Sequence, residues 1–215
     1  MKKNKTMRVA AVMVVLAMLS TCLVSGTFAK YVTSGSSSDT ARVAKWGVTV
    51  TPSDNSMFKT TYATSDDQGY TGNSVVSSND AEQVVAPGTS GGLSTVELGG
   101  KSEVAVRVTN KAEVKLTGWT VDGADYCPLV VSVGGKAIAY PGTVTGYENA
   151  IKAAIEAYTA DYAPGTDLGS KTDACPVVTW KWAFEGNDDT KDTKLGDAGS
   201  ANVNISITTT LTQID

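Results

Sequence analysis

The last stretch of the chain, residues 203–214, reads Val-Asn-Ile-Ser-Ile-Thr-Thr-Thr-Leu-Thr-Gln-Ile. Apolar and polar residues alternate with a period of two, which is typical of a β-strand with one buried face. Val203, Ile205, Ile207 and Leu211 share one face of such a strand. The stretch therefore predicts a long strand that closes an antiparallel sheet.

Further strand-like segments lie upstream, rich in β-branched residues and bounded by Gly, Asn or Pro: 41–50, 93–98, 103–109, 114–121, 129–133, 136–140 and 177–184. In the first of these we expect Trp46, Val48 and Val50 to form a buried face. Gly134-Gly135 has the composition of a two-residue hairpin, and 53–80 has that of long loops with one weak hairpin. Together these segments predict a mainly β domain over 41–215, an antiparallel β-sandwich of jelly-roll-like type.

One helix interrupts the strands. Thr145 and Glu148 have the spacing of a capping box, and Pro164 follows the helical pattern as a stop. The residues at helical spacing are Tyr147, Ile151, Ile155, Tyr158 and Tyr162. This pattern predicts an amphipathic helix over about 145–163. Its aromatic stripe either faces the core, the more common case, or lines a ligand groove.

Composition excludes several classes of function. The 215 residues contain no histidine, which removes His-based triads, His general bases and His-ligated zinc. The formal charge of −4 argues against a nucleic-acid partner. No nucleophile with an activating base and no phosphate-binding glycine motif stands out, so we expect neither enzyme activity nor a cofactor.

The N-terminus has the organisation of a secretory signal peptide. Lys2, Lys3, Lys5 and Arg8 precede an apolar run over 9–24, and small residues before Ala29 fit a cleavage site. We expect residues 1–29 to be removed by a signal peptidase, so that the membrane is a partner only through the leader. The alternatives are an uncleaved anchor and a lipoprotein processed at Cys22. Loss of four cations would leave a secreted chain of charge −8.

The new N-terminus would carry a short strand and a hinge. Lys30, Tyr31, Val32, Thr33 and Ser34 have β character, and the Gly/Ser-rich residues up to 40 that follow have linker composition. Such a strand is either a frayed tail or a strand that completes another sheet.

Two further sites are candidates. Cys127 and Cys175 remain after leader removal, and an even pair in an exported chain favours a disulfide over two separate buried thiols. Asp188, Asp189 and Asp192 lie in the densest acidic cluster and are weak calcium candidates. The cluster lacks the spacing of an EF-hand and is more typical of a solvated hairpin tip, so we expect no metal site.

Several segments resemble the camelysin and TasA-like family. They are Ser25–Tyr31 at the leader exit, Ala41–Val48, the tryptophan strand Trp180–Glu185, and the acidic turn with Asn187-Asp188 and Asp192–Gly196. The middle of the chain, 53–174, carries no motif that aligns.

The resemblance implies a secreted Gram-positive protein, processed by a dedicated signal peptidase, with a jelly-roll-like domain that assembles into biofilm-matrix fibres. In fibre-forming relatives the freed N-terminal strand inserts into the next subunit, a head-to-tail form of β-augmentation. Camelysin is catalogued as a cell-surface metalloprotease, so proteolysis is the alternative that the resemblance implies, although this chain offers no His ligand and no HExxH helix. An adhesin or carbohydrate-binding sandwich is a further alternative, with Trp180 and Trp182 as its aromatic stripe.

Overall fold

A computed structural model describes residue 13 and residues 41–52, 56–63, 72–94, 96–185 and 188–215. The chain divides into two compact units, Met1–Arg42 and Val43–Asp215. Apart from Met13, the predicted signal peptide 1–29 and donor segment 30–40 lie outside the described residues. Among the described residues, the search for a helix long and apolar enough to cross a bilayer found none.

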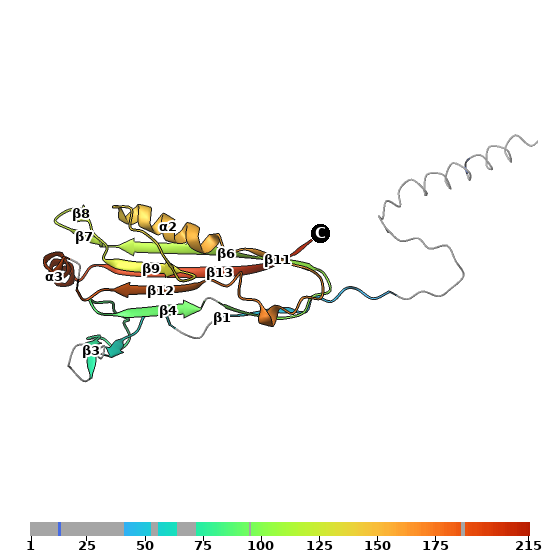
Figure 1. Cartoon of the computed structure of the whole chain (residues 1–215), viewed down its shortest axis with the longest axis horizontal. Helices are drawn as coiled ribbons and strands as arrows, with labels where there is room; N and C mark the ends of the chain where they lie inside the picture. The colour runs from blue at the N-terminus through green and yellow to red at the C-terminus, as the bar shows by residue number, and fades with distance from the viewer. Residues whose placement is uncertain (1–12, 14–40, 53–55, 64–71, 95, 186–187) are drawn as a thin grey trace, which may run out of the picture. The chain divides into compact units, whose positions relative to one another are not determined.

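Two antiparallel sheets make up the second unit (Figure 1). The first has the order β10-β9-β12-β4, with β4 at Ser90–Ser94, β9 at Leu129–Val133, β10 at Lys136–Ala137 and β12 at Val177–Trp182. The second has the order β11-β6-β13, with β6 at Ala105–Thr117, β11 at Ala160–Tyr162 and β13 at Asn202–Ile214. The predicted fold class, a mainly β antiparallel sandwich, is confirmed.

Smaller elements surround the two sheets. They are the strand pairs β1 (Val48–Pro52) with β5 (Val96–Gly100), β2 (Thr61–Ala63) with β3 (Asn73–Val76), and β7 (Thr120–Val121) with β8 (Ala124–Asp125). The helices are α2 (Val144–Glu156), the short 3-10 helix η2 (Leu168–Ser170) and α3 (Asp189–Ala198).

β6 and β13 form the longest ladder of the described chain. They pair from Asn202↔Thr117 to Ile214↔Ala105, so each strand is matched along its whole length. Val203, Ile205 and Ile207 pack against the main core, as the alternation predicts, but they are only half-buried. Their exposure follows from position, since β13 lies at the edge of its sheet.

The core lies between the two sheets and under α2. Its fully buried members come from β6, β9, β12 and α2, and include Val131, Tyr147, Ile151 and Val178. A second, smaller cluster contains Val106, Val108 and Leu168. The aromatic and aliphatic stripe of α2 is therefore core, as expected for Tyr147, Ile151 and Ile155.

Several predicted strand boundaries are wrong, and the strand expected over 136–140 is β10, which ends at Ala137. Residues 93–98 form parts of two strands, because the chain leaves the first sheet after Ser94 and enters a different sheet at Val96. Conversely, 103–109 and 114–121 belong largely to one strand, β6. Asn110 is buried inside β6, where its amide donates to the carbonyls of Tyr158 and Ala174 and accepts from Thr209, which offsets the cost of burial.

The strand predicted over 41–50 starts only at Val48 and buries no continuous face. Trp46 is 46% exposed and Val50 is 37% exposed. The physical reason is that β1 pairs with β5 in a two-stranded sheet of its own, where only Val48 of the expected face packs against the second, smaller cluster, beside Val96 and Leu98 of β5.

The helices also differ from the prediction. α2 begins after Thr143, whose side chain accepts from the Gly146 N–H, and ends at Glu156, while Tyr162 lies on β11. The predicted hairpin tip is the helix α3, in which Asp188 caps the first turn and Gly199 adopts the left-handed conformation after the last. A capping aspartate and a glycine after the last turn are ordinary signals of helix ends. In this segment the high content of acidic residues makes the sequence look like a solvated hairpin tip instead.

Candidate strand-acceptor edge

Helix α2 covers one open side of the sandwich by hydrogen bonding to strand edges. The Tyr147 hydroxyl accepts from the Val131 N–H at 2.8 Å and donates to the Leu129 carbonyl at 3.0 Å, both on β9. Glu156 and Glu148 accept from the N–H groups of Ala112 and Leu116 on β6, at 3.2 and 2.6 Å. These three side chains satisfy backbone groups that a neighbouring strand would otherwise pair.

The same contacts fix which backbone groups of β13 point outward. Since the even-numbered N–H groups of β6 face α2, the odd-numbered groups of β6 face β13. Odd residues of β6 pair with even residues of β13, for example Lys115 with Asn204. The N–H and C=O groups of odd residues in β13, from Val203 to Gln213, therefore point away from the sheet.

This outer edge of β13 has no strand neighbour in the described part of the chain. The edge is long and its inward-facing side chains are apolar, and such edges bind additional strands readily. Near its start, the Trp119 indole N–H donates to the Asn202 carbonyl at 2.8 Å. The two sides of the sandwich thus differ: α2 covers one, and the β13 side is open.

A groove of about 570 Å³ runs along the beginning of this open edge. One wall is the start of β13, including Val203 and Asn204, and the other includes Phe58, Val84 and Val85. Trp119, Trp182 and Leu195 also line it and are buried. The groove has a mixed lining, with apolar side chains such as Phe58 and Val84 beside polar ones such as Gln83 and Asn204, and it lies along outward-pointing strand-edge groups, as a site for an added strand does.

The wall opposite β13 is anchored in the core. The Trp180 indole N–H donates to the Met57 carbonyl at 2.9 Å, and the Phe58 ring lies 5.3 Å from the Trp180 ring. A Cβ built on Gly91 would collide with the Met57 carbonyl, so only glycine permits this approach. The Tyr62 hydroxyl accepts from the Lys59 N–H and donates to the Val84 carbonyl, which holds both segments of the wall together.

Helix α3 closes one end of the groove through Asp192. The buried carboxylate accepts from the Tyr126 hydroxyl at 2.6 Å and from the Trp182 indole N–H at 3.1 Å. Burial, and then the hydrogen bond to Asp192, raise the pKa of Tyr126 far above its ordinary value, so this hydroxyl remains a donor at physiological pH. Leu195 of the same helix is 2% exposed.

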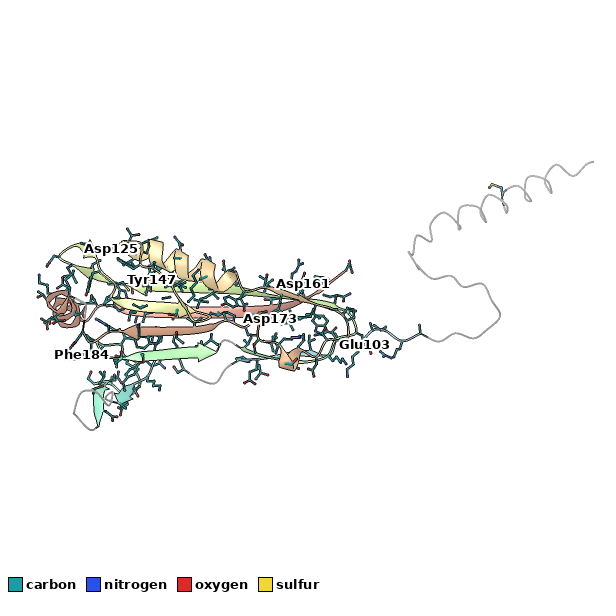
Figure 2. All side chains as sticks on the ribbon, in the orientation of Figure 1. Glu103, Asp125, Tyr147, Asp161, Asp173 and Phe184 are labelled. Carbon is teal, nitrogen blue, oxygen red and sulfur yellow. The ribbon has the colours of Figure 1, made fainter. Side chains whose placement is uncertain are left out.

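The chain enters the second unit at the other end of the sandwich. Backbone bonds join Lys45 to Glu103 and Gly47 to Lys101, close to the start of β6 at Ala105. Figure 2 shows Glu103 and Phe184 at opposite ends of this unit. From Ala105 to Leu116, which pairs with Val203 at the groove, eleven residues of strand span about 37 Å. We call the end of the sandwich near Glu103 the entry end, and the end near Phe184 the α3 end.

The α3 end carries an excess of negative charge. The exposed carboxylates there belong to Glu82, Asp122, Glu185, Asp188, Asp189 and Asp197. Lys191 pairs with Asp188 at 3.0 Å, and Lys194 with Asp122 at 2.6 Å. After these pairs are counted, Glu82, Glu185, Asp189 and Asp197 remain against Lys59 and Lys181, which adjoin the groove residues, so a smaller negative excess favours a cationic segment there.

The predicted disulfide is not formed, and its geometry is wrong. Cys127 and Cys175 are both free and buried, in two different clusters. Each precedes a strand, but β9 and β12 are antiparallel, with Leu129 opposite Trp182 and Val133 opposite Val178. The two strand starts therefore lie at opposite ends of the pair, about 17 Å apart, far beyond disulfide range.

The calcium candidates do not converge on an ion. Asp188 caps α3 and pairs with Lys191, Asp189 lies in the first helical turn, and both oxygens of Asp192 accept hydrogen bonds from the protein. In the described ranges, no three acidic or cysteine side chains gather around a possible metal position.

The tryptophan pair is also not a surface stripe. Trp180 and Trp182 are 2% and 5% exposed, and both indole N–H groups are hydrogen bonded inside the protein. They cannot stack on a sugar in this arrangement.

A second hollow, of about 650 Å³, is lined by Cys127, Tyr126, Tyr140 and Tyr147 among others. Burial raises the pKa of the Cys127 thiol to about 12, so the thiol stays protonated and is a poor nucleophile. The hydroxyls of Tyr126 and Tyr147 already have partners. The hollow offers no activated group for catalysis.

Sequence reasoning missed the residues that distinguish the two sides of the sandwich. Tyr147 was recognised as core, but its hydroxyl also completes the edge of β9, and Glu148 was expected in a capping box rather than on β6. Two glutamates eight residues apart on one helix, Glu148 and Glu156, are the signal that was available. Comparisons with family models, with curated proteins and with solved structures gave no significant match to this chain.

Proposed function

We propose that this protein is a secreted, non-enzymatic structural subunit of extracellular matrix fibres, which polymerises by donating its N-terminal strand to the next subunit. The observation that carries the proposal is the contrast between the two sides of the sandwich. α2 satisfies the strand edges on one side, while the outer edge of β13 and the groove beside it are open in the described chain.

The donor is the segment Lys30–Ser34, freed when the signal peptide is removed. Added beside Val203, Ile205 and Ile207, it would pair with the outward N–H and C=O groups of β13. Tyr31 and Thr33 point to one face of such a strand and Val32 to the other. One of these sets enters the groove beside its apolar residues Trp182 and Phe58.

The length of the segment between Ser34 and Val43 favours insertion of the donor into the groove of a second copy rather than into the groove of its own subunit. Nine Cα steps from Ser34 to Val43 span at most about 32 Å. The groove lies about 37 Å from the start of β6, and Val43 precedes even the Lys45–Glu103 contact at the entry end. Ser34 therefore falls short of its own groove, so the whole donor cannot lie there, whereas all of it can enter a groove presented by a neighbour. Because the contact joins opposite ends of two subunits, it repeats into a filament.

Charge also favours this pairing. After cleavage the segment 30–47 carries Lys30, Arg42, Lys45 and a new amino group against Asp39. This cationic arm complements the acidic α3 end, which attracts it and orients its approach.

The decisive experiment compares the mature chain from Lys30 with a variant that lacks Lys30–Ser34. We expect fibres from the first, and folded monomers from the second, by electron microscopy and sedimentation. The precursor with residues 1–29 should also stay monomeric, because its leader blocks the donor. Fibres from the deletion variant would refute strand donation.

A matched pair of variants tests the acceptor. Val203→Pro removes an N–H that points away from the sheet, so the subunit should fold, but elongation should stop. Asn204→Pro removes an N–H that pairs with β6 and should instead destabilise the subunit itself. A free peptide of Lys30–Ser34 should inhibit elongation of the unmodified protein and bind the Val203→Pro variant more weakly.

A further inference from the structure

Large hydrophobic side chains are exposed at both ends of the described unit, in addition to Val76 on β3 and Val177 on β12. Val43, Trp46 and Val50 lie near the entry end and are 91%, 46% and 37% exposed. Phe184 is 57% exposed and lies at the α3 end, beside Gly88 (Figure 2). Exposed tryptophan and phenylalanine side chains of this size are typical of protein interfaces.

We call the exposed side chains of Val43, Trp46 and Val50 the Trp46 surface, and the exposed side chain of Phe184 the Phe184 surface. Neither surface is required by the fold of the subunit. Trp46 precedes β1, and its segment is held by backbone bonds such as that from Lys101 to Gly47, and by the Lys45 N–H donating to the Glu103 carboxylate. Phe184 follows β12 and contacts Gly88 through its ring. The backbone beside Trp46 is thus held by hydrogen bonds and the Phe184 ring lies next to Gly88, while a large part of each side chain stays in solvent, at a cost that burial in an interface would remove.

We propose a second contact between successive subunits, in which the Trp46 surface of one copy packs against the Phe184 surface of the next. The inference rests on the proposed function, because strand donation brings the entry end of one subunit to the α3 end of its neighbour. The short connection between Ser34 and Val43 limits the gap between the two ends. Once the strand is inserted, this apolar contact forms at high effective concentration.

The two contacts have different roles. Strand insertion supplies directional backbone pairing, whereas the Trp46–Phe184 contact fixes the angle between subunits and lowers the rate at which a terminal subunit leaves. Lys45 beside Trp46 and Glu185 beside Phe184 have opposite charges, which favours this orientation.

The test measures the critical concentration for fibre growth of Trp46→Ser, using the mature chain from Lys30. We expect an increase of about tenfold or more, since buried tryptophans commonly dominate interfaces. The matched control is Val177→Ser, which alters a side chain of equal 46% exposure on β12 and should leave growth unchanged. Binding of the free Lys30–Ser34 peptide should be the same in all three proteins.

Cross-linking provides an independent readout. Subunits with Trp46→Cys, mixed with subunits carrying Phe184→Cys, should form disulfide-linked dimers within fibres, and either variant alone should not. Cys127 and Cys175 are buried and should stay unreactive. An unchanged critical concentration for Trp46→Ser together with no cross-link would overturn the second contact while strand donation stands. Fibres from the Lys30–Ser34 deletion would instead refute the proposed function.

Discussion

The hydroxyl of Tyr147 forms hydrogen bonds with two buried backbone groups at once. Removing it should therefore lower the free energy of unfolding by more than the loss of one atom from the packing would. Tyr147→Phe leaves the Val131 N–H and the Leu129 carbonyl without a partner. Each buried unpaired group costs about 1–3 kcal/mol, and we expect the free energy of unfolding to fall by about 2–4 kcal/mol. Urea denaturation measures this. Tyr158→Phe on the half-exposed tyrosine just after the same helix should change stability by less than about 0.5 kcal/mol.

The cysteines give a second prediction at the level of single residues. Burial raises the pKa of Cys127 from 9.0 to about 12, and burial, followed by the charge of Asp173, raises that of Cys175. Neither thiol should react with Ellman's reagent at pH 8 until the protein unfolds, and a reductant should leave the melting temperature unchanged. A fast-reacting native thiol would contradict the burial described above.

The pH dependence of stability follows from the same thiol. Between pH 9 and 12 the unfolded chain releases the Cys127 proton while the folded protein keeps it. This thiol therefore stabilises the fold fully below pH 9, and its contribution is lost as pH rises towards 12. Cys127→Ala should flatten the decline in unfolding free energy between pH 8 and 11, relative to the unmodified chain.

At the level of elements, Asp192 hydrogen bonds α3 to Tyr126 and Trp182, beside the buried Leu195 and the Lys194–Asp122 pair, and two substitutions separate its charge from its hydrogen bonding. Asp192→Ala leaves the Trp182 indole N–H unpaired and should detach α3, with a loss of about 2–4 kcal/mol and red-shifted tryptophan fluorescence. Asp192→Asn should be nearly neutral, because its carbonyl can accept from Trp182 and its amide can donate to Tyr126. Equal losses in both variants would mean that the charge itself is required.

Some of these elements could be predicted from sequence patterns and others could not. The alternation at 203–214 and the glycine pair at 134–135 gave the correct strand and hairpin, because both depend on local periodicity and local dihedral preference. The split between β4 and β5, and the exposure of Trp46, depend on which sheet each segment joins. Which sheet a segment joins is decided by tertiary pairing and not by the local sequence pattern. A half-buried edge strand has the same alternation of apolar and polar residues as a half-buried interior strand.

At the level of the whole molecule, assembly should depend strongly on ionic strength. In the proposed assembly a cationic arm meets an acidic groove end, and the Debye length shortens from about 10 Å at 0.1 M salt to about 3 Å at 1 M. We expect elongation, followed by light scattering, to slow over this range. Asp189→Lys with Asp197→Lys, both exposed, should slow elongation at low salt and remove most of its salt dependence.

The antiparallel ladder between β1 and β5 has a mechanical consequence. In the proposed fibre under tension, the load would enter each subunit through the arm, pass the Lys45–Glu103 and Gly47–Lys101 bonds, and then act along β1. The five residue pairs from Val48↔Gly100 to Pro52↔Val96 would then be sheared together, whereas a pull across the ladder would unzip them one at a time. Such a subunit would resist stretching up to a threshold force and then unfold abruptly, instead of lengthening gradually as the force rises.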